Sequence, residues 1–580
     1  MTTPPPTLEP VDLILYGGIV WTADPHHPLA SAIAVTGDRI ARVGGDPEIL
    51  PLASEGTELV DLAGRMVCPG FNDAHTHFEN AVDWHFQVAL TDVNDQVRLE
   101  ERVAATAARL TPGVWITGGD LGDFASTREE AVTLIEPDLA AIDALTPGNP
   151  LLIRRADHQY FANSKALEVA NIDRETPDPR GGRFGRDADG ELTGMLYGQA
   201  GEFLHRLVTP MSLEQKLLGA RGVMAGLNAV GITSVHDIAR LPSVTDETIP
   251  PVYLERSFSN AQIFQTLADR GELSVRVYAF LPLDTHDRLP GHGVTPKTGD
   301  DWLRFGALKI FVDSGAMLAP FDLAGASGTG LTDSWSYRFV GEERLAELVL
   351  AGDAAGFDIG VHVQGDRGCR IAIDAFERAA LLNGPRDRRH RLIHAWHLAA
   401  DDFARAGELG LIADVTSDQL LHYSANLDQA LGLARSANAF AWRRMIDSDI
   451  TVNLVSDLPG AFNKSHVAEI NPLRNMYAAI TRKAGDSAQS EPFHPDQAIT
   501  VDEALLAYTA NPAYSSHEED VKGSITPGKL ADLVVLSEDI RAGAPEVLLR
   551  ASVERTYLGG RLVHAVTDHG AGTTVSVREP

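Results

Sequence analysis

The middle of the chain, from about residue 64 to residue 520, alternates short apolar runs with longer amphipathic stretches. The apolar runs have the length of buried strands, and the stretches between them repeat apolar residues at helical spacing. Strands are predicted over residues 66–75, 231–237, 274–281, 303–313, 357–363, 391–395, 411–416 and 450–457. Helices are predicted over residues 97–110, 212–229, 343–355, 370–383, 401–409, 440–447 and 501–510. Alternating strands and helices form parallel sheets, so the pattern predicts an α/β fold built on a (β/α)8 barrel of the TIM type.

Both ends of the chain show a different pattern, in which short strands are divided by glycine turns. Near the amino end this pattern is VDLILYGGIVWTAD, and near the carboxyl end it is VERTYLGGRLVHAV. Paired glycines between apolar runs are typical of turns between strands. We therefore predict a small β-sandwich domain composed of residues 1–63 and 521–580, with a barrel of residues 64–520 inserted between its halves.

A long insertion, at about residues 80–210, separates the first two predicted barrel strands. It contains further strand-like and helical stretches, VWITGGDL and PLLIRRADHQYFANSKAL, and a loop rich in glycine, proline and aspartate. Long insertions in a compact domain usually carry function. We expect this one to form a lid or a substrate-recognition element of the barrel.

The charge of the chain limits its partners. Its 49 basic and 80 acidic residues are spread along the sequence and give a net charge of −31. A nucleic acid or an anionic membrane would need a basic surface, so neither is expected, whereas a small-molecule substrate is. No secretory signal is visible, and no uncharged apolar run reaches the ~18 residues of a membrane span. The two cysteines, Cys68 and Cys369, give no disulfide framework, which predicts a cytoplasmic protein in a reducing compartment.

A His-x-His pair closes the first predicted barrel strand, in the segment CPGFNDAHTH. Side chains alternate sides along a strand, so His75 and His77 face the same way and can bind one cation together. Such a short motif is also common as two ordinary polar residues at a strand end. Its meaning therefore depends on whether other strands supply further ligands. Cys68 is not expected among them, because it lies near the other end of the same predicted strand.

Barrel enzymes place their active sites at the carboxyl ends of the strands. Four further residues lie near such ends: Lys309, His362, His394 and Asp457. Each has an ordinary alternative: Lys309 could form a buried ion pair with Asp313, the histidines could be hydrogen-bonded core residues, and Asp457 could cap a turn. Together with the histidine pair, they form a nitrogen and oxygen ligand set that suits Zn²⁺ better than Mn²⁺ or Fe²⁺.

The segment PGFNDAHTH at residues 69–77 resembles the first-strand signature of the amidohydrolase superfamily. The similarity extends over nearly the whole chain and points to the YtcJ-like branch, the "amidohydrolase 3" group that includes N-substituted formamide deformylases. Further matching segments are NSKAL at 163–167, GITSVHD at 231–237, KIFVD at 309–313, HVQGD at 362–366, SDLP at 456–459 and KGSITPGKLADL at 522–533.

The resemblance implies a centre of two divalent ions, with Zn²⁺ as the expected metal. It assigns the more buried ion to His75, His77 and Asp457, and the second ion to His362 and His394. A carbamylated Lys309 would bridge the two ions, and a centre with one ion is the alternative. Relatives of this kind are commonly dimers or larger, so a homodimer is expected.

The implied activity is hydrolysis of an amide-type C–N bond. Asp457 would take a proton from the attacking water and pass it to the leaving nitrogen. Asp73 and Asp237 would orient the metal-binding histidines from behind. The residues expected near the substrate are His158, Met317 and Phe321.

Two other functions stay open. The same barrel could serve a mononuclear deaminase or an ester or lactone hydrolase, or it could be a non-catalytic scaffold, although a scaffold should have lost ligands and none is lost here.

The chain departs from the family pattern at three places. Ile393 and Gly198 stand where the family often has glutamate, and Ser314-Gly315 reverses the usual Gly-Ser. These departures bear on the substrate and leave the ligand set intact.

Overall fold

The computed structural model describes residues 10–90, 93, 95–121, 135–155, 159–179, 182–205, 207–208, 211–238, 259–314, 337–338, 340–417, 419–420, 432–458, 470–483 and 491–566. The chain divides into two compact units. One unit contains both ends of the chain and the parallel barrel, and the other contains the described residues between 79 and 223. None of the described helices combines the length and apolar character that crossing a membrane requires.

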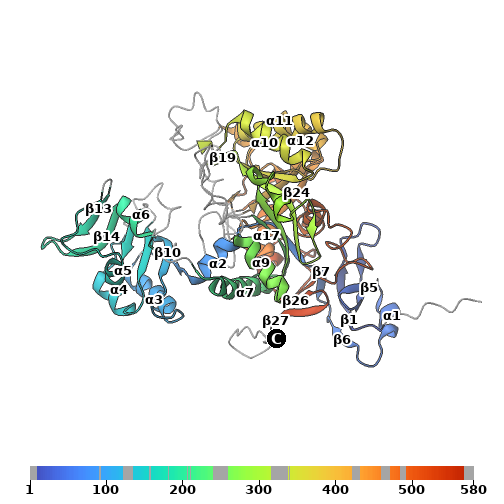
Figure 1. Cartoon of the computed structure of the whole chain (residues 1–580). Helices are drawn as coiled ribbons and strands as arrows, with labels where there is room; N and C mark the ends of the chain where they lie inside the picture. Colours follow the sequence, from blue (N-terminus) through green and yellow to red (C-terminus); the bar gives the residue numbers. More distant parts are fainter. Residues whose placement is uncertain are drawn as a thin grey trace, which may run out of the picture. The chain divides into compact units, whose positions relative to one another are not determined.

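Eight parallel strands form the barrel within the described ranges (Figure 1). They are β8 (Phe71–Thr76), β15 (Ile232–Ile238), β16 (Arg276–Pro282), β18 (Leu303–Phe311), β21 (Asp358–Val363), β22 (Arg391–His394), β23 (Ile412–Thr416) and β24 (Thr451–Val455). Each strand pairs with the next, and a parallel bridge between Thr76 and Leu458 joins the end of the series to its beginning. The predicted (β/α)8 barrel is therefore confirmed.

Helices follow the barrel strands and bury one apolar face each. They include α7 (Leu213–Ala229), α9 (Ser259–Asp269), α10 (Glu342–Ala354), α11 (Asp366–Asn383), α12 (Asp402–Glu408), α16 (Trp442–Asp447), α17 (Pro472–Thr481), α18 (Val501–Ala507) and α19 (Ala510–Ser515). In α11 the buried residues Ala372, Phe376 and Ala379 recur at helical spacing, as expected for a helix packed on a sheet. This helix ends at Gly384, whose φ of 78° is readily adopted only by glycine.

The two chain ends build two sheets that pack together. The first sheet has the order β5-β4-β1-β6, from β1 (Leu13–Tyr16), β4 (Ala32–Thr36), β5 (Arg39–Gly44) and β6 (Glu58–Asp61). The second has the order β27-β26-β25-β7-β2-β3, from β2 (Ile19–Trp21), β3 (Leu29–Ala30), β7 (Met66–Pro69), β25 (Leu533–Leu536), β26 (Val553–Leu558) and β27 (Arg561–Ala565). Leu15 and Val35 of the first sheet share one core with Val67, Val535 and Tyr557 of the second. This core confirms the predicted sandwich of both termini.

The strand predicted over residues 66–75 is two strands that belong to different sheets. β7 pairs with β25 of the terminal sheet, and β8 pairs with β15 of the barrel. The break falls at Gly70, where an added Cβ would clash with Oγ1 of Thr233. Only glycine fits this close approach of two strands. Cys68 therefore lies in the sandwich, buried, on a different strand from the histidine pair.

The second unit begins within the helix α2 (Phe78–Phe86), which follows β8, and it contains a sheet with the order β13-β14-β12-β11-β10-β9. Its strands are β9 (Val88–Ala89), β10 (Ile116–Leu121), β11 (Leu151–Arg155), β12 (Tyr160–Ala162), β13 (Gly182–Arg186) and β14 (Leu192–Gly198). Its helices are α3 (Gln96–Ala107), α4 (Leu139–Leu145), α5 (Ser164–Val169) and α6 (Gln199–His205) (Figure 1). Ile153 packs with Leu99 of α3, whereas its neighbour Leu152 packs with Leu167 of α5. The alternation shows that helices cover both faces of this sheet.

Candidate metal centre

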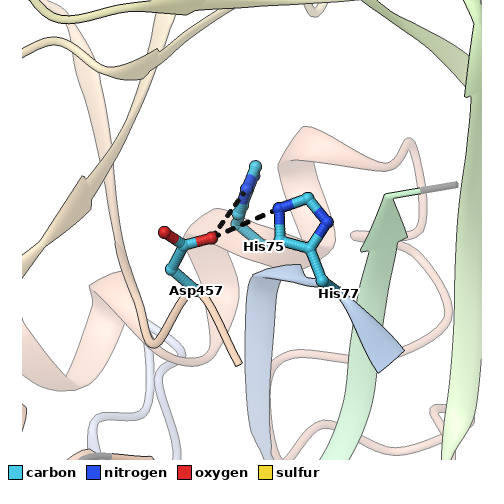
Figure 2. Close-up of side chains that lie close together, drawn as sticks. All are labelled: His75, His77 and Asp457. Atoms are coloured by element: carbon cyan, nitrogen blue, oxygen red, sulfur yellow. Dashed lines mark ion pairs between the residues drawn. The ribbon is translucent and has the colours of Figure 1, made fainter. Parts of the chain in front are cut away.

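Two ends of the barrel sheet meet at His75, His77 and Asp457. Oδ1 of Asp457 lies 3.2 Å from Nε2 of His75 and 3.4 Å from Nε2 of His77. Figure 2 shows both imidazole rings turned toward the same carboxylate oxygen. One ligand atom from each residue lies within 4.8 Å of the others, so the three could hold a single cation.

The backbone at the closing seam of the barrel fixes this group. The amide of Asp457 donates to the carbonyl of His75 (3.1 Å), and the amide of His77 donates to the carbonyl of Leu458 (2.7 Å). Asp457 itself has a φ of 57°, in the left-handed region that non-glycine residues rarely adopt. A strained backbone of this kind persists only where its surroundings hold it, and such positions are concentrated at functional sites.

His394, His362 and Lys309 come from neighbouring strands and lie beside the first three residues. The ring centroids of His394 and His75 are 5.3 Å apart, and those of His394 and His362 are 4.5 Å apart. Nζ of Lys309 lies 4.8 Å from the centroid of Phe311, which stacks on His362. His394 also has a left-handed backbone, with a φ of 70°. The six candidate ligands predicted from the sequence thus lie around the same end of the barrel.

Burial controls the protonation of these side chains. It lowers the pKa of all four histidines, and for His75, His362 and His394 the pKa falls well below its ordinary value. Burial likewise lowers the pKa of Lys309 to about 7. The histidines are therefore neutral near neutral pH, which is the form that binds a metal.

Several buried atoms of this group lack a hydrogen-bond partner among the described residues. They are Nδ1 of His75, Nε2 of His362 and Nζ of Lys309. Buried polar atoms in folded proteins are nearly always paired, so a cluster of unpaired donors and acceptors is typical of a ligand-binding site. Neutral imidazoles and a carboxylate that converge in a buried site fit a divalent cation such as Zn²⁺.

The predicted supporting carboxylates bind the backbone around the histidines. Oδ1 of Asp73 accepts from the amides of His75 (3.3 Å) and Ser456 (3.1 Å), and it thereby links the first and last barrel strands. Burial raises the pKa of Asp73 to about 7. Oδ1 of Asp237 accepts from the amide of Phe78 at 2.7 Å, just beyond the histidine pair. Asp73 therefore fixes the end of β8 to the segment after β24, and Asp237 fixes the residue that follows the histidine pair.

Asp313 has a different role from the ion pair considered as an alternative for Lys309. Its two carboxylate oxygens accept from the amides of Gln364 (2.8 Å) and Gly365 (2.9 Å), at the start of α11. No ion pair between Asp313 and Lys309 occurs among the described residues, so this alternative is wrong. The free amides at the beginning of a helix are strong donors to a carboxylate, and they outcompete the lysine.

Two features of this site were not predicted from the sequence. Gln419 follows β23, and its amide Nε2 lies 3.3 Å from Oδ2 of Asp457, while its Oε1 accepts from the indole Nε1 of Trp396. Deeper in the barrel, the guanidinium of Arg391 donates to Nδ1 of His236 (3.0 Å) and to the carbonyl of Ser515 (2.7 Å). The only available signal for Gln419 was a polar amide just past a strand end that had no candidate ligand.

The three residues expected near the substrate, His158, Met317 and Phe321, lie outside the described residues.

The chain is similar to known proteins over most of its length. The chain is 30% identical to the protein LONG AFTER FAR-RED 3 of Arabidopsis thaliana, with 97% of this chain and 93% of that protein covered. It is 29% identical to the N-substituted formamide deformylase of Arthrobacter pascens, with 95% and 98% covered. A solved structure of an uncharacterized metal-dependent hydrolase from Pyrococcus furiosus has the same fold, with a TM-score of 0.68, 21% identity, and coverage of 91% of this chain and 100% of the other.

The family model described as "Amidohydrolase family" matches residues 58–564, a range that begins in the terminal sandwich, spans the whole barrel and returns to the sandwich. The chain therefore belongs to the amidohydrolase family.

Proposed function

We propose that this protein hydrolyses an amide-type C–N bond with the help of divalent metal ions, Zn²⁺ by preference. The observation that carries the proposal is the convergence of His75, His77 and Asp457 at the carboxyl ends of the barrel strands. The similarity over 95% of the chain to an N-substituted formamide deformylase supports a C–N bond as the target. A simple N-substituted formamide is accordingly the first substrate class to test.

In this proposal, His75, His77 and Asp457 would hold one ion. His362 and His394 would hold a second ion, and a carbamylated Lys309 would be a ligand shared by the centre. A bound divalent ion supplies positive charge that polarises a carbonyl oxygen and lowers the pKa of water toward neutrality. The buried and unpaired Nζ of Lys309 supports its part in the site, because a neutral amine is the form that adds CO₂ and releases one proton.

Asp457 is the residue placed to move the proton. Its carboxylate lies beside both imidazoles and is 8% exposed, so it can reach a substrate while remaining shielded from bulk water. It would accept the proton of the attacking water as oxygen adds to the carbonyl carbon. It would then return that proton to nitrogen as the C–N bond breaks, giving a carboxylic acid and an amine.

The test combines metal content with turnover. Purified protein should contain bound Zn²⁺ by elemental analysis and should release formate and amine from N-substituted formamides. Chelation should abolish this activity, and added Zn²⁺ should restore it. His75→Asn should lose both metal and turnover, whereas His26→Ala, which changes an exposed histidine, should lose neither.

The stoichiometry and the substrate panel decide between the alternatives. Two ions per chain, with carbamate density on Lys309 in a crystal structure, would support the bridged centre, and one ion would favour the mononuclear version. Faster cleavage of matched formate esters than of formamides would move the protein to the ester hydrolases. A protein that binds no divalent metal and cleaves neither class would be a scaffold.

A further inference from the structure

We propose that Gln419 is a positioning residue for Asp457, and that Trp396 fixes Gln419 in turn. We call the three side chains Trp396, Gln419 and Asp457 the relay. This inference rests on the proposed role of Asp457 in proton transfer and adds two residues to it. The relay runs along the rim of the barrel, because its members follow the adjacent strands β22, β23 and β24 in that order.

The contacts of the relay are specific at each link. The indole Nε1 of Trp396 donates to Oε1 of Gln419, and Nε2 of Gln419 donates to Oδ2 of Asp457 at 3.3 Å. Trp396 is 1% exposed, Gln419 is 2% exposed and Asp457 is 8% exposed. Water therefore has little access to these groups, and it cannot readily replace a hydrogen bond that is lost.

The direction of the relay follows from hydrogen-bond chemistry. An indole N–H can only donate, so the carbonyl end of the Gln419 amide must face Trp396. The amino end then faces Asp457, and a carboxylate can only accept. Each group can thus bind its neighbour in one orientation only, and Trp396 prevents the amide of Gln419 from turning over.

The result is that the two oxygens of Asp457 have different partners. Oδ2 accepts from Gln419, whereas Oδ1 faces Nε2 of both His75 and His77. The carboxylate can rotate about its bond to Cβ, and its own backbone is in the strained left-handed region. Gln419 therefore holds the carboxylate in the rotation that presents Oδ1 to the metal-binding histidines.

A purely structural role for Gln419 is the competing explanation, because any buried amide that loses its partners destabilises a protein. Asn228 provides a matched control. It is 2% exposed, and its Nδ2 donates to the carbonyls of Ile232 (3.1 Å) and Ser274 (2.8 Å), at the amino ends of β15 and β16. Replacing it with leucine removes a buried amide without touching the relay.

The first experiment detects the relay without metal or substrate. The seven tryptophan indole N–H signals of the ¹⁵N-labelled, metal-free protein are recorded by NMR, and Trp396→Phe assigns the signal of interest. Gln419→Met should shift that signal upfield, because the acceptor is lost. The signal of Trp442 should stay in place, because this buried indole has no hydrogen-bond partner among the described residues. An unmoved Trp396 signal would overturn the relay.

The second experiment measures what the relay does. Gln419→Met should lower kcat on an N-substituted formamide ~10–100-fold, with KM and bound Zn²⁺ close to those of the unchanged protein. Trp396→Phe should cause a smaller loss, and the double variant should be no slower than Gln419→Met alone, because Trp396 acts through Gln419. Asn228→Leu should lower the melting temperature and leave kcat unchanged.

The outcomes separate the inference from the proposed function. If Trp396 and Gln419 are linked in the NMR spectra but Gln419→Met has the kcat of the unchanged protein, the positioning role is wrong while hydrolysis stands. A fall in kcat matched by Asn228→Leu would likewise make the effect structural. If the unchanged protein binds no metal and cleaves no formamide, the proposed function and the positioning role are both wrong, and the NMR result still decides whether the relay exists.

Discussion

The two ends of the barrel strands hold buried polar groups in opposite ways. At the carboxyl ends, Nζ of Lys309 and Nε2 of His362 are buried without a hydrogen-bond partner among the described residues. At the amino end of β16, Arg276 donates to both carboxylate oxygens of Asp532, at 2.7 and 2.9 Å. Buried charge is costly unless it is paired, so a fold tolerates unpaired groups mainly where function requires them. At these positions the amino end of the barrel holds a buried ion pair, whereas the carboxyl ends hold the unpaired groups of the candidate metal centre.

The amino ends of the barrel strands, which we call the paired end, also connect the barrel to the terminal sandwich. Asp532 lies just before β25, and its Oδ1 accepts from the amide of Gly559 (2.8 Å) as well as from Arg276. At the amino end of β21, Asp358 accepts from His517 (2.7 Å) and from the amide of Arg389 (2.9 Å). Both oxygens of each of these carboxylates have a partner among the described residues.

The largest expected effect on turnover comes from removing the negative charge of Asp457, at the carboxyl ends of the barrel strands. Asp457→Asn keeps the size of the side chain but removes its ability to accept a proton. Turnover should fall ~10²–10⁴-fold, the usual contribution of a positioned general base. Most of the bound Zn²⁺ should remain, because four histidines are unchanged, and the melting temperature should stay the same or rise, as is common at active sites. Steady-state kinetics, elemental analysis and calorimetry check the three parts. Retained turnover would remove Asp457 from proton transfer.

The opposite result is expected when the paired end is broken. Arg276→Met leaves the carboxylate of Asp532 buried and uncompensated, so the free energy of unfolding should fall by ~3–5 kcal/mol. The double variant Arg276→Met/Asp532→Leu should recover much of this loss, because it removes the orphaned charge. Denaturant unfolding measures the stability, and kcat of the folded fraction should match that of the unchanged protein. A large loss of kcat in the folded fraction would show that the two ends are not independent.

Metal binding should stabilise the protein only through the candidate ligands at the carboxyl ends of the barrel strands. A ligand present at 100 times its Kd stabilises the state that binds it by ~2.7 kcal/mol. Adding Zn²⁺ to chelated protein should therefore raise its melting temperature, and His75→Asn should abolish the increase. His517→Asn, which alters the paired end, should lower the melting temperature of the metal-free protein. Addition of Zn²⁺ should still raise that melting temperature. A Zn²⁺ response that survives His75→Asn would place the stabilising ion elsewhere.

The sequence predicts the barrel well because buried strands are contiguous apolar runs. β18, β21 and β24 lie within the predicted ranges. The polar residues near the carboxyl ends of these strands could therefore be recognised from the sequence. The break at Gly70 could not be predicted, since it depends on the approach of Thr233 from a distant part of the chain. The Pro69-Gly70 dipeptide indicates a turn, but nothing in the local sequence shows that the strands on its two sides belong to different sheets.

The candidate ligands could be predicted from the sequence only as a set, because each histidine and Lys309 also has an ordinary alternative in an apolar strand. The contacts that hold these side chains in place could not be predicted from the sequence. Gln419 acquires its meaning only from Trp396 and Asp457, which come from other strands. The left-handed backbone of His394 and Asp457 is likewise set by the closure of the barrel rather than by their neighbours in sequence.

The smallest expected effect is on the pH dependence of the free energy of unfolding, through Asp353 at the paired end of the barrel. Asp353, at the end of α10, accepts from Nε of Arg388 (2.8 Å) and contacts Nε2 of His390 (3.2 Å). Burial alone would raise the pKa of Asp353, but the hydrogen bonds from His390 and Arg388 outweigh it and hold that pKa well below its ordinary value. A depressed pKa gives stability that is present above the pKa of the unfolded chain, ~3.9, and is lost as the pH falls below it.

Below pH ~4 the unfolded chain therefore binds up to one more proton at this position than the folded protein, which costs up to ~1.4 kcal/mol for each pH unit. Asp353→Asn should be less stable than the unchanged protein at neutral pH, and the difference should shrink as the pH falls toward 3. Unfolding by denaturant across this range measures the slope. Asp269→Asn, at an exposed position, should leave the slope unchanged. A constant difference between Asp353→Asn and the unchanged protein would mean that Asp353 titrates alike in both states, and that its ion pairs do not produce the stability of the paired end.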